Sequence, residues 1–218
     1  MNENSVLTNE INGLIYTTER FEAVVSVDHY LDKYVDVETF LEACKACPNY
    51  CKIWSCPSYD FDVIDYWKQY KTLELVAIKI NFDESIAGKE IPAEMQDEIN
   101  KNSIWEVKEQ LAKELFEREE AVPGSISLSA GSCTLCKGAG GQHDDRGTSE
   151  NDSKLSVDWC TRLAGKPCRH PERMRYSIES LGGNVGTTLS ELMEIELEWI
   201  QEGRMPSYFV LVSGLLRP

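Results

Sequence analysis

The sequence lacks any apolar stretch long enough to cross a membrane. Its longest apolar run, YFVLVSGLL near the C-terminus, is far shorter than the roughly 20 residues that a spanning helix needs. The first ten residues, MNENSVLTNE, also lack the basic start and apolar centre of a secretory signal peptide. These absences predict a soluble, cytoplasmic protein with no membrane partner.

Basic residues are scarce, because 22 Lys and Arg stand against 37 Asp and Glu, a net charge of −15. A nucleic-acid-binding protein usually carries a basic face, and an acidic chain is repelled by phosphates. We therefore expect no nucleic-acid partner.

The chain also lacks internal repeats and a glycine motif for a dinucleotide or flavin. The segment GGNVGTT, from Gly182, does not have the G-x-G-x-x-G spacing and follows a predicted helix rather than a strand. This argues against an independent oxidoreductase with its own nucleotide cofactor.

The 218 residues, 42% of them apolar, suffice for one domain over 1–218 with an ordinary core. Apolar patterns predict four strands, at 20–28, 73–82, 125–130 and in the C-terminal run. Strands interleaved with helices predict a mixed α/β or α+β fold, in which helices flank a sheet of at least four strands.

Helix signals accompany these strands. The clearest are the apolar spacing of residues 93–120 and Asp36, which is placed to cap a helix before the first cysteines. Another helix is expected over 62–70. Near the end of the chain, one helix should begin at Pro171 and stop at Gly182, and another should span 188–203.

Cysteine is the residue that stands out. The first group lies in a loop at 43–60 with the spacing C-x2-C-x3-C-x4-C; the second lies at 131–170 with the spacing C-x2-C-x23-C-x7-C, including a polar insertion at 137–158. The candidate metal ligands are Cys44, Cys47, Cys51, Cys56, Cys133, Cys136, Cys160 and Cys168.

Clustered thiols in a reducing compartment are more often metal ligands or redox groups than disulfides. A thioredoxin-like dithiol needs only two thiols, so it leaves Cys51 and Cys56 unexplained. Four thiolates are the complement for either a [4Fe–4S] cluster or a structural zinc ion. Two groups without an obvious histidine favour two [4Fe–4S] clusters, with zinc as the alternative.

The segments CKACPNYCKIWSCPSYD, AGSCTLC and GKPCRHPERMRYSIESLGGNV resemble a family of cysteine-rich, predicted metal-binding proteins of unknown function, frequent in anaerobic bacteria and archaea. The resemblance covers about residues 40–215 and implies that all eight cysteines are ligands, for iron–sulfur clusters. It implies no particular reaction. The polar insertion departs from the compact second group of the family, which makes Cys160 the least secure ligand.

Arg169 and Arg173 lie in the one basic concentration of the chain, next to Cys168. They are candidates to neutralise an anionic cluster or to hold an anionic substrate, and the alternative is ordinary pairing with Glu172 and Glu179. A helix beginning at Pro171 would also point its positive end at a centre on Cys168.

Histidine adds little to this set. His170 is expected near a helix start rather than on a metal. His143 lies beside Asp144 in the insertion and could supply a substitute ligand if Cys160 is not one.

We therefore expect an iron–sulfur protein that carries electrons within a reductive enzyme system of an anaerobe. Its partner would be a redox protein or a small anionic substrate. The alternatives are a zinc-stabilised binding module without redox activity and a reductase with its own anionic substrate site.

Overall fold

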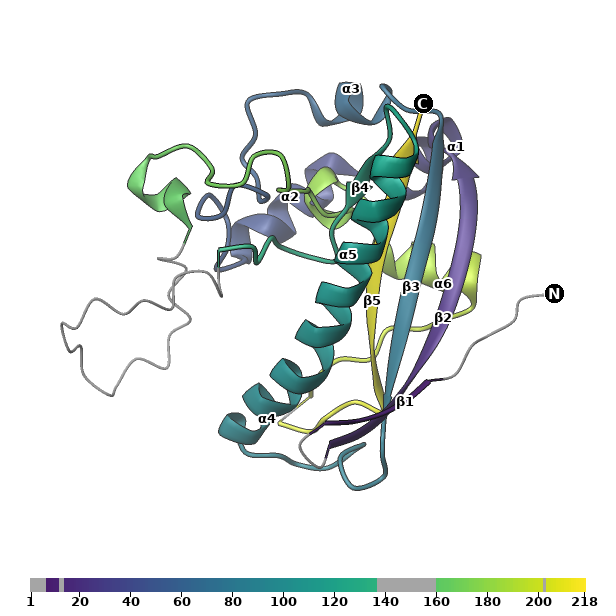
Figure 1. Ribbon diagram of the computed structural model, residues 1–218, viewed down its shortest axis with the longest axis vertical. Helices are drawn as coiled ribbons and strands as arrows, with labels where there is room; N and C mark the ends of the chain where they lie inside the picture. The colour runs from purple at the N-terminus through teal and green to yellow at the C-terminus, as the bar shows by residue number, and fades with distance from the viewer. Residues whose placement is uncertain (1–6, 12–13, 137–159, 202) are drawn as a thin grey trace.

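A computed structural model describes residues 7–11, 14–136, 160–201 and 203–218. Within them, five strands form one antiparallel sheet in the order β1-β2-β3-β5-β4 (Figure 1). The strands are β1 (Leu7–Ile11), β2 (Leu14–Ser26), β3 (Thr72–Phe82), β4 (Ile126–Leu128) and β5 (Tyr208–Arg217). The mixed fold and the four expected strands are confirmed, and β1 is an addition. The insertion, with His143 and Asp144, lies outside the described residues.

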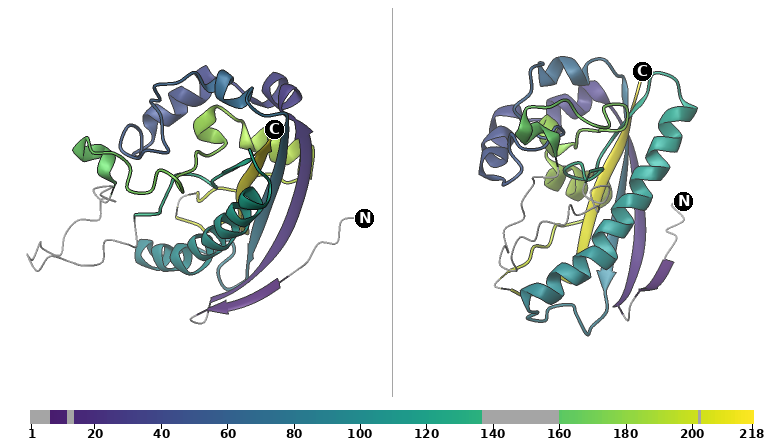
Figure 2. Two further views of the ribbon diagram at one scale, coloured as in Figure 1. Left: turned by 45° about the horizontal axis from the view of Figure 1, so that its top comes forward. Right: turned by 60° about the vertical axis from the view of Figure 1, so that its left-hand side comes forward.

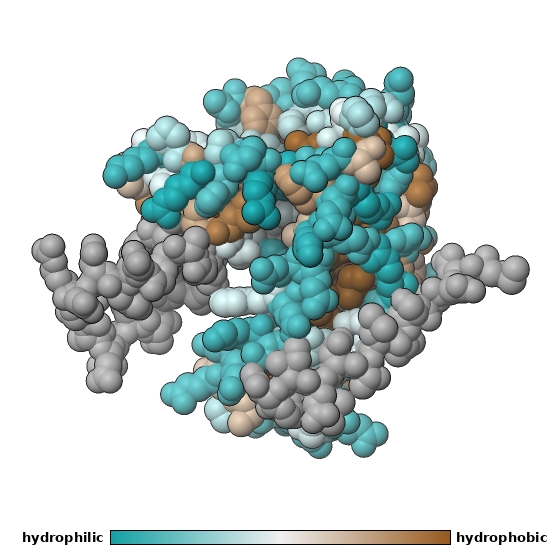
Figure 3. Space-filling model, in the orientation of Figure 1, coloured by the Kyte–Doolittle hydropathy of each residue, from teal (hydrophilic) through white to brown (hydrophobic). Residues whose placement is uncertain are grey.

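One face of the sheet is covered by a long helix. This helix runs through α4 (Ala93–Asn100), a π-helical turn η1 (Lys101–Trp105) and α5 (Glu106–Ala121), as the apolar spacing of 93–120 predicts. Its apolar side chains pack on alternate residues of β3, such as Val76 and Ile80. The outward face of α5 is hydrophilic (Figure 3).

The other face of the sheet carries shorter helices. They are α1 (Val27–Tyr34), α2 (Val37–Ala46), α3 (Val63–Trp67), α6 (Val185–Met193) and the 3-10 turns η2 (Thr161–Ala164) and η3 (Glu179–Leu181). Residues of β3 that point away from α5, including Leu73 and Leu75, pack here against α1, α3 and α6. Figure 2 (right) shows α5 on one side of the sheet and α2 on the other. None of the described helices is long and apolar enough to cross a membrane.

The contact between α2 and the turn after η3 is close and fixes the start of α2. A Cβ on Gly182, which has φ +80°, would lie 2.9 Å from the Cα of Val37. The Gly182 carbonyl accepts from the Asp36 N–H at 2.9 Å, and Asp36 caps α2 as predicted, accepting from the Thr39 N–H at 3.0 Å. A glycine is needed at position 182 because only glycine allows both this φ and this approach.

The helix predicted from Pro171 is wrong. His170 accepts from the N–H of Arg173 and of Met174, so one turn forms, and the chain then leaves it. Ser129, which follows β4, donates its N–H to the Tyr176 carbonyl at 2.7 Å. The Tyr176 carbonyl, which a helix would use for its own hydrogen bond, is therefore bound to the residue that follows β4. This tertiary contact overrides the local helix signal of Pro171.

The helix predicted over 188–203 is wrong at both ends. It starts earlier, at the Asn184 cap, and it ends at Glu194, which has φ +56°. The Ile195 N–H donates back to the Leu189 carbonyl at 3.2 Å, which is a common way to close a helix in the left-handed conformation. The helix predicted over 62–70 is confirmed in its central residues, as α3.

Candidate metal centre

The first cysteine group begins at the C-terminal end of α2. Cys44 is in the helix, Cys47 is its C-terminal cap, and Cys51 and Cys56 follow in consecutive turns. The Cys47 N–H donates to the Cys44 carbonyl at 3.0 Å, and the Cys51 N–H donates to the Pro57 carbonyl at 2.8 Å. These bonds fold the loop back on itself and bring its thiols together.

The thiols of this loop differ in environment. Burial raises the pKa of Cys56 to about 11 and also raises that of Cys44, and nearby Cys47 adds to both shifts. Cys51 is exposed, and hydrogen bonding from the Ser58 backbone lowers its pKa below that of an ordinary thiol. Cys44, Cys47 and Cys56 therefore lie close enough to interact electrostatically, while Cys51 is exposed.

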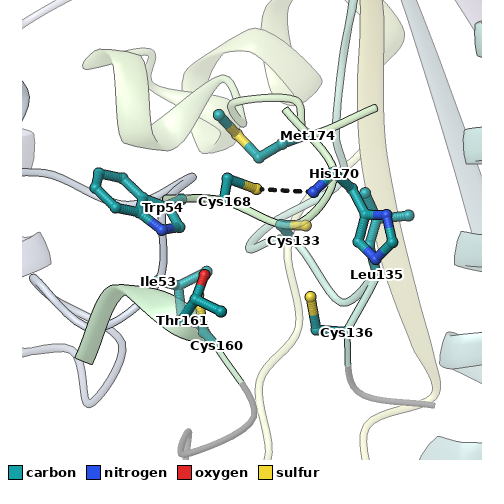
Figure 4. Close-up of a pocket in the computed structure, with 10 residues that line it drawn as sticks. All are labelled: Ile53, Trp54, Cys133, Leu135, Cys136, Cys160, Thr161, Cys168, His170 and Met174. Atoms are coloured by element: carbon teal, nitrogen blue, oxygen red, sulfur yellow. Dashed lines mark hydrogen bonds between the residues drawn. The ribbon is translucent and has the colours of Figure 1, made fainter. Parts of the chain in front are cut away.

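The second cysteine group lines one pocket, although its members come from two separate segments. Figure 4 shows the four side chains around a common space. The pocket is lined by Ile53, Trp54, Cys133, Leu135, Cys136, Cys160, Thr161, Cys168, His170 and Met174. Cys136 and Cys160 are buried, and Cys133 and Cys168 are half-buried. Cys160, the least secure ligand from the sequence, thus belongs to the pocket wall, and its role as a ligand stays a prediction.

The environment of this pocket disfavours the free thiolate form of its cysteines. Burial raises the pKa of Cys133 and of Cys168, and neighbouring cysteines raise both further. The His170 backbone N–H donates to the Cys168 Sγ at 3.4 Å (Figure 4). A metal would neutralise the mutual repulsion of the thiolates, and its binding would release their protons.

No set of three or more His, Cys, Asp or Glu side chains among the described residues is placed to hold a single metal ion. The four cysteines that line the pocket therefore do not form the closed tetrahedron of a structural zinc site. A four-iron cube separates its four cysteine sulfurs more widely than one ion does. The chemistry of the donor set, four thiols in an apolar wall, fits such a cluster.

The two cysteine loops are joined by direct contacts. Arg162, which is two residues after Cys160, donates to the carbonyls of Ile53, Cys56 and Ser58; the first and last of these bonds measure 2.7 and 2.6 Å. Ile53, Cys56 and Cys160 form a small apolar cluster, against which Trp54 and Cys133 pack. The first loop is therefore part of the wall of the second site.

The contacts of Arg162 and the pocket position of His170 do not emerge from the sequence. Arg162 has no local signal, since its partners are carbonyl groups about a hundred residues earlier in the chain. His170 was placed at a helix start, yet it lines the pocket. Its position two residues after Cys168 is a signal for this placement, but the proline that follows His170 indicates a helix.

The arginines singled out in the sequence lie elsewhere. Arg169 and Arg173 are exposed and are not in the pocket wall, and the guanidinium carbon of Arg173 lies 5.6 Å from the centre of the Phe116 ring. Arg175 forms an ion pair with Glu119 rather than with Glu172 or Glu179. The role of Arg169 and Arg173 beside an anionic group stays a prediction. The helix N-terminus expected at Cys168 is absent, and the backbone donor to its Sγ comes from a turn.

A mixed α+β domain in which two four-cysteine loops share a wall defines a candidate metalloprotein. Residues 31–216 match the family described as "Predicted metal-binding protein (DUF2284)". The chain therefore belongs to this family, and the resemblance seen in the cysteine segments is confirmed. No curated protein and no solved structure matches the chain.

Proposed function

We propose that the chain is an iron–sulfur protein that binds one [4Fe–4S] cluster on each four-cysteine group and serves electron transfer. The observation that carries this proposal is the convergence of Cys133, Cys136, Cys160 and Cys168 on one pocket with largely apolar walls. A four-iron cluster needs four thiolates and shielding from water, and both are available there. The family description supports metal binding in general.

Two features favour iron–sulfur clusters over zinc. All eight candidate ligands are cysteines, and no three of them among the described residues are placed to hold one ion. Soft thiolates suit both metals, but a structural zinc site is a closed tetrahedron.

The contact between the loops supports a role in carrying electrons. Cys56 of the first group shares one packed cluster with Cys133 and Cys160 of the second group. Groups bound at these positions would be neighbours, so that an electron could pass between them within the chain. When bound, each cluster would supply a reversible one-electron couple.

The exposed side chains of Arg169 and Arg173 then have a role outside the pocket. They lie on the segment that carries Cys168 and offer positive charge in an acidic protein. We assign them to the docking of a redox partner protein or of a small anionic substrate.

The decisive experiment is the metal analysis of protein made and purified without oxygen. We expect brown protein with about eight irons and an equal amount of sulfide, four of each per cysteine group. Cys47→Ser and Cys136→Ser should each remove about half of the iron. Colourless protein with stoichiometric zinc, obtained despite ample iron, would falsify the proposal and support the zinc-stabilised module.

A further inference from the structure

Among the residues that the structure describes, none accepts a hydrogen bond from the indole N–H of Trp54, although its nitrogen is buried. Indole is a donor only, and a buried donor without an acceptor costs about 1–3 kcal/mol. Trp54 belongs to the first cysteine loop, yet it lines the pocket of the second group. In Figure 4 the nitrogen-bearing ring lies on the side of the cysteines, and the six-membered ring is turned away from them.

The position of this indole is fixed from several sides. Its neighbours Ile53 and Ser55 are both 1% exposed, so the backbone around it is held in the interior. The guanidinium carbon of Arg162 lies 5.3 Å from the centre of the Trp54 ring, and the same guanidinium binds the Ile53 carbonyl. A side chain held in this way cannot swing out to give its N–H to bulk water without breaking these contacts.

We propose that Trp54 donates its indole N–H to sulfur at the second metal centre and thereby tunes that centre from the first loop. The proposal rests on the proposed function, since the acceptor is a cysteine thiolate or a sulfide of the cluster. Hydrogen bonds to sulfur stabilise the more negative, reduced state of a cluster and raise its reduction potential. Trp54 is thus a positioning and tuning residue, and it is not a ligand.

The test compares anaerobically prepared wild-type protein with Trp54→Phe, which keeps an aromatic ring and removes the donor. Trp199→Phe is the matched control, because Trp199 is 69% exposed and is not in the pocket wall. Redox titrations followed by electron paramagnetic resonance give the potential of each centre. We expect the reduction potential of one centre to fall by about 59 mV in Trp54→Phe. For a one-electron couple this is a tenfold change of the reduced-to-oxidised ratio toward the oxidised state. The control should not shift.

A second measurement detects the contact in protein that retains Trp54. Wild-type protein labelled with 15N at the tryptophan indole should show a weak nitrogen coupling to the reduced second centre. Trp159 immediately precedes Cys160, so labelled Trp159→Phe is needed to assign the coupling. If the coupling is absent, or if it disappears in Trp159→Phe, Trp54 is not the donor.

The outcomes separate this inference from the proposed function. Iron and sulfide at the expected content, with unchanged potentials in Trp54→Phe, overturn the role of Trp54 and leave the proposed function standing. Wild-type protein without iron overturns both. A lower potential confined to one centre in Trp54→Phe, together with a 15N coupling that Trp159→Phe retains, supports the inference.

Discussion

The backbone N–H of Cys133 donates to Ser55 Oγ at 2.8 Å, although 78 residues separate them in the sequence. Ser55 is 1% exposed, and its own carbonyl accepts from the Tyr59 hydroxyl at 2.8 Å. One small hydroxyl thus ties the first cysteine loop to the first candidate ligand of the second group. The two cysteine segments are structurally one unit.

Ser55→Ala should weaken this unit without removing any candidate ligand. The variant leaves the partly buried Cys133 N–H without this acceptor, which costs up to about 1–3 kcal/mol. We expect a lower free energy of unfolding and faster loss of iron to a chelator, with initial iron content close to that of the wild type. Ser190→Ala is the control, because the Ser190 hydroxyl donates only within α6, to the Thr187 carbonyl. Equal iron release from both variants would show that the bond to Cys133 is unimportant.

Arg162→Lys tests whether the guanidinium holds the loops together by its geometry or only by its charge. Lysine keeps the charge, but its single ammonium cannot reproduce the planar fork that reaches three carbonyls. We expect faster amide hydrogen exchange in residues 51–58 and weaker retention of both metal centres.

Arg204→Lys is the matched control for that variant. Arg204 also donates to a distant carbonyl, that of Gly88 at 3.5 Å, but it lies away from the cysteine loops. If exchange in residues 51–58 is the same in Arg162→Lys as in the control, charge alone is sufficient.

Thiol reactivity provides a test of the first loop without metal. Alkylation proceeds through the thiolate, so both exposure and pKa decide its rate. Cys51 is exposed and its pKa is lowered, whereas Cys56 is buried with a pKa raised to about 11. In metal-free protein near pH 7.5, iodoacetamide should modify Cys51 first and Cys56 last of the four, as followed by peptide mass spectrometry. Bound metal should protect all four, and modification of Cys56 before Cys51 would contradict the described loop.

Much of the scaffold could be predicted from the sequence because its signals are local. The apolar run of β3, the helical spacing of 93–120 and the Asp36 cap each act within a few residues. Met95, which falls in the same helical spacing, is nevertheless 51% exposed near the start of α4.

The failures arose where distant segments decide the conformation. Pro171 is a good helix start, but the bond from Ser129 to Tyr176 draws the chain toward β4. The cysteine spacing indicated a metal site, yet it could not show that Trp54 and Arg162 link the two groups. Such contacts join residues about a hundred positions apart, and no periodicity or motif records them.

The last prediction concerns the ion pair between Arg175 and Glu119, which joins the segment after Cys168 to α5. Both side chains are largely buried, at 12% and 14% exposed, and Arg175 Nε donates to Glu119 Oε2 at 2.9 Å. Burial alone would raise the pKa of Glu119, but hydrogen bonds from Arg175 and Ser127 outweigh it and lower the pKa below its usual range. A lowered pKa stabilises the fold above the pKa of the unfolded chain, and this stability is lost as the pH falls through the folded value.

Glu119→Gln should therefore be less stable than the wild type near pH 7, by up to about 3–5 kcal/mol, because it leaves Arg175 without its charge partner. The difference should shrink as the pH falls below about 4, since a protonated Glu119 is neutral and close in shape to Gln. Urea unfolding of both proteins at each pH gives this difference, in which contributions from other groups cancel. Glu117→Gln is the control on the same helix, since Glu117 pairs with Lys113 only at 4.0 Å in an exposed position and should contribute about 0–1 kcal/mol. If the difference in the free energy of unfolding between the wild type and Glu119→Gln stays constant from pH 7 to pH 3.5, the prediction is wrong. The charge of the Glu119 carboxylate then does not hold Arg175 and the cysteine segment against α5.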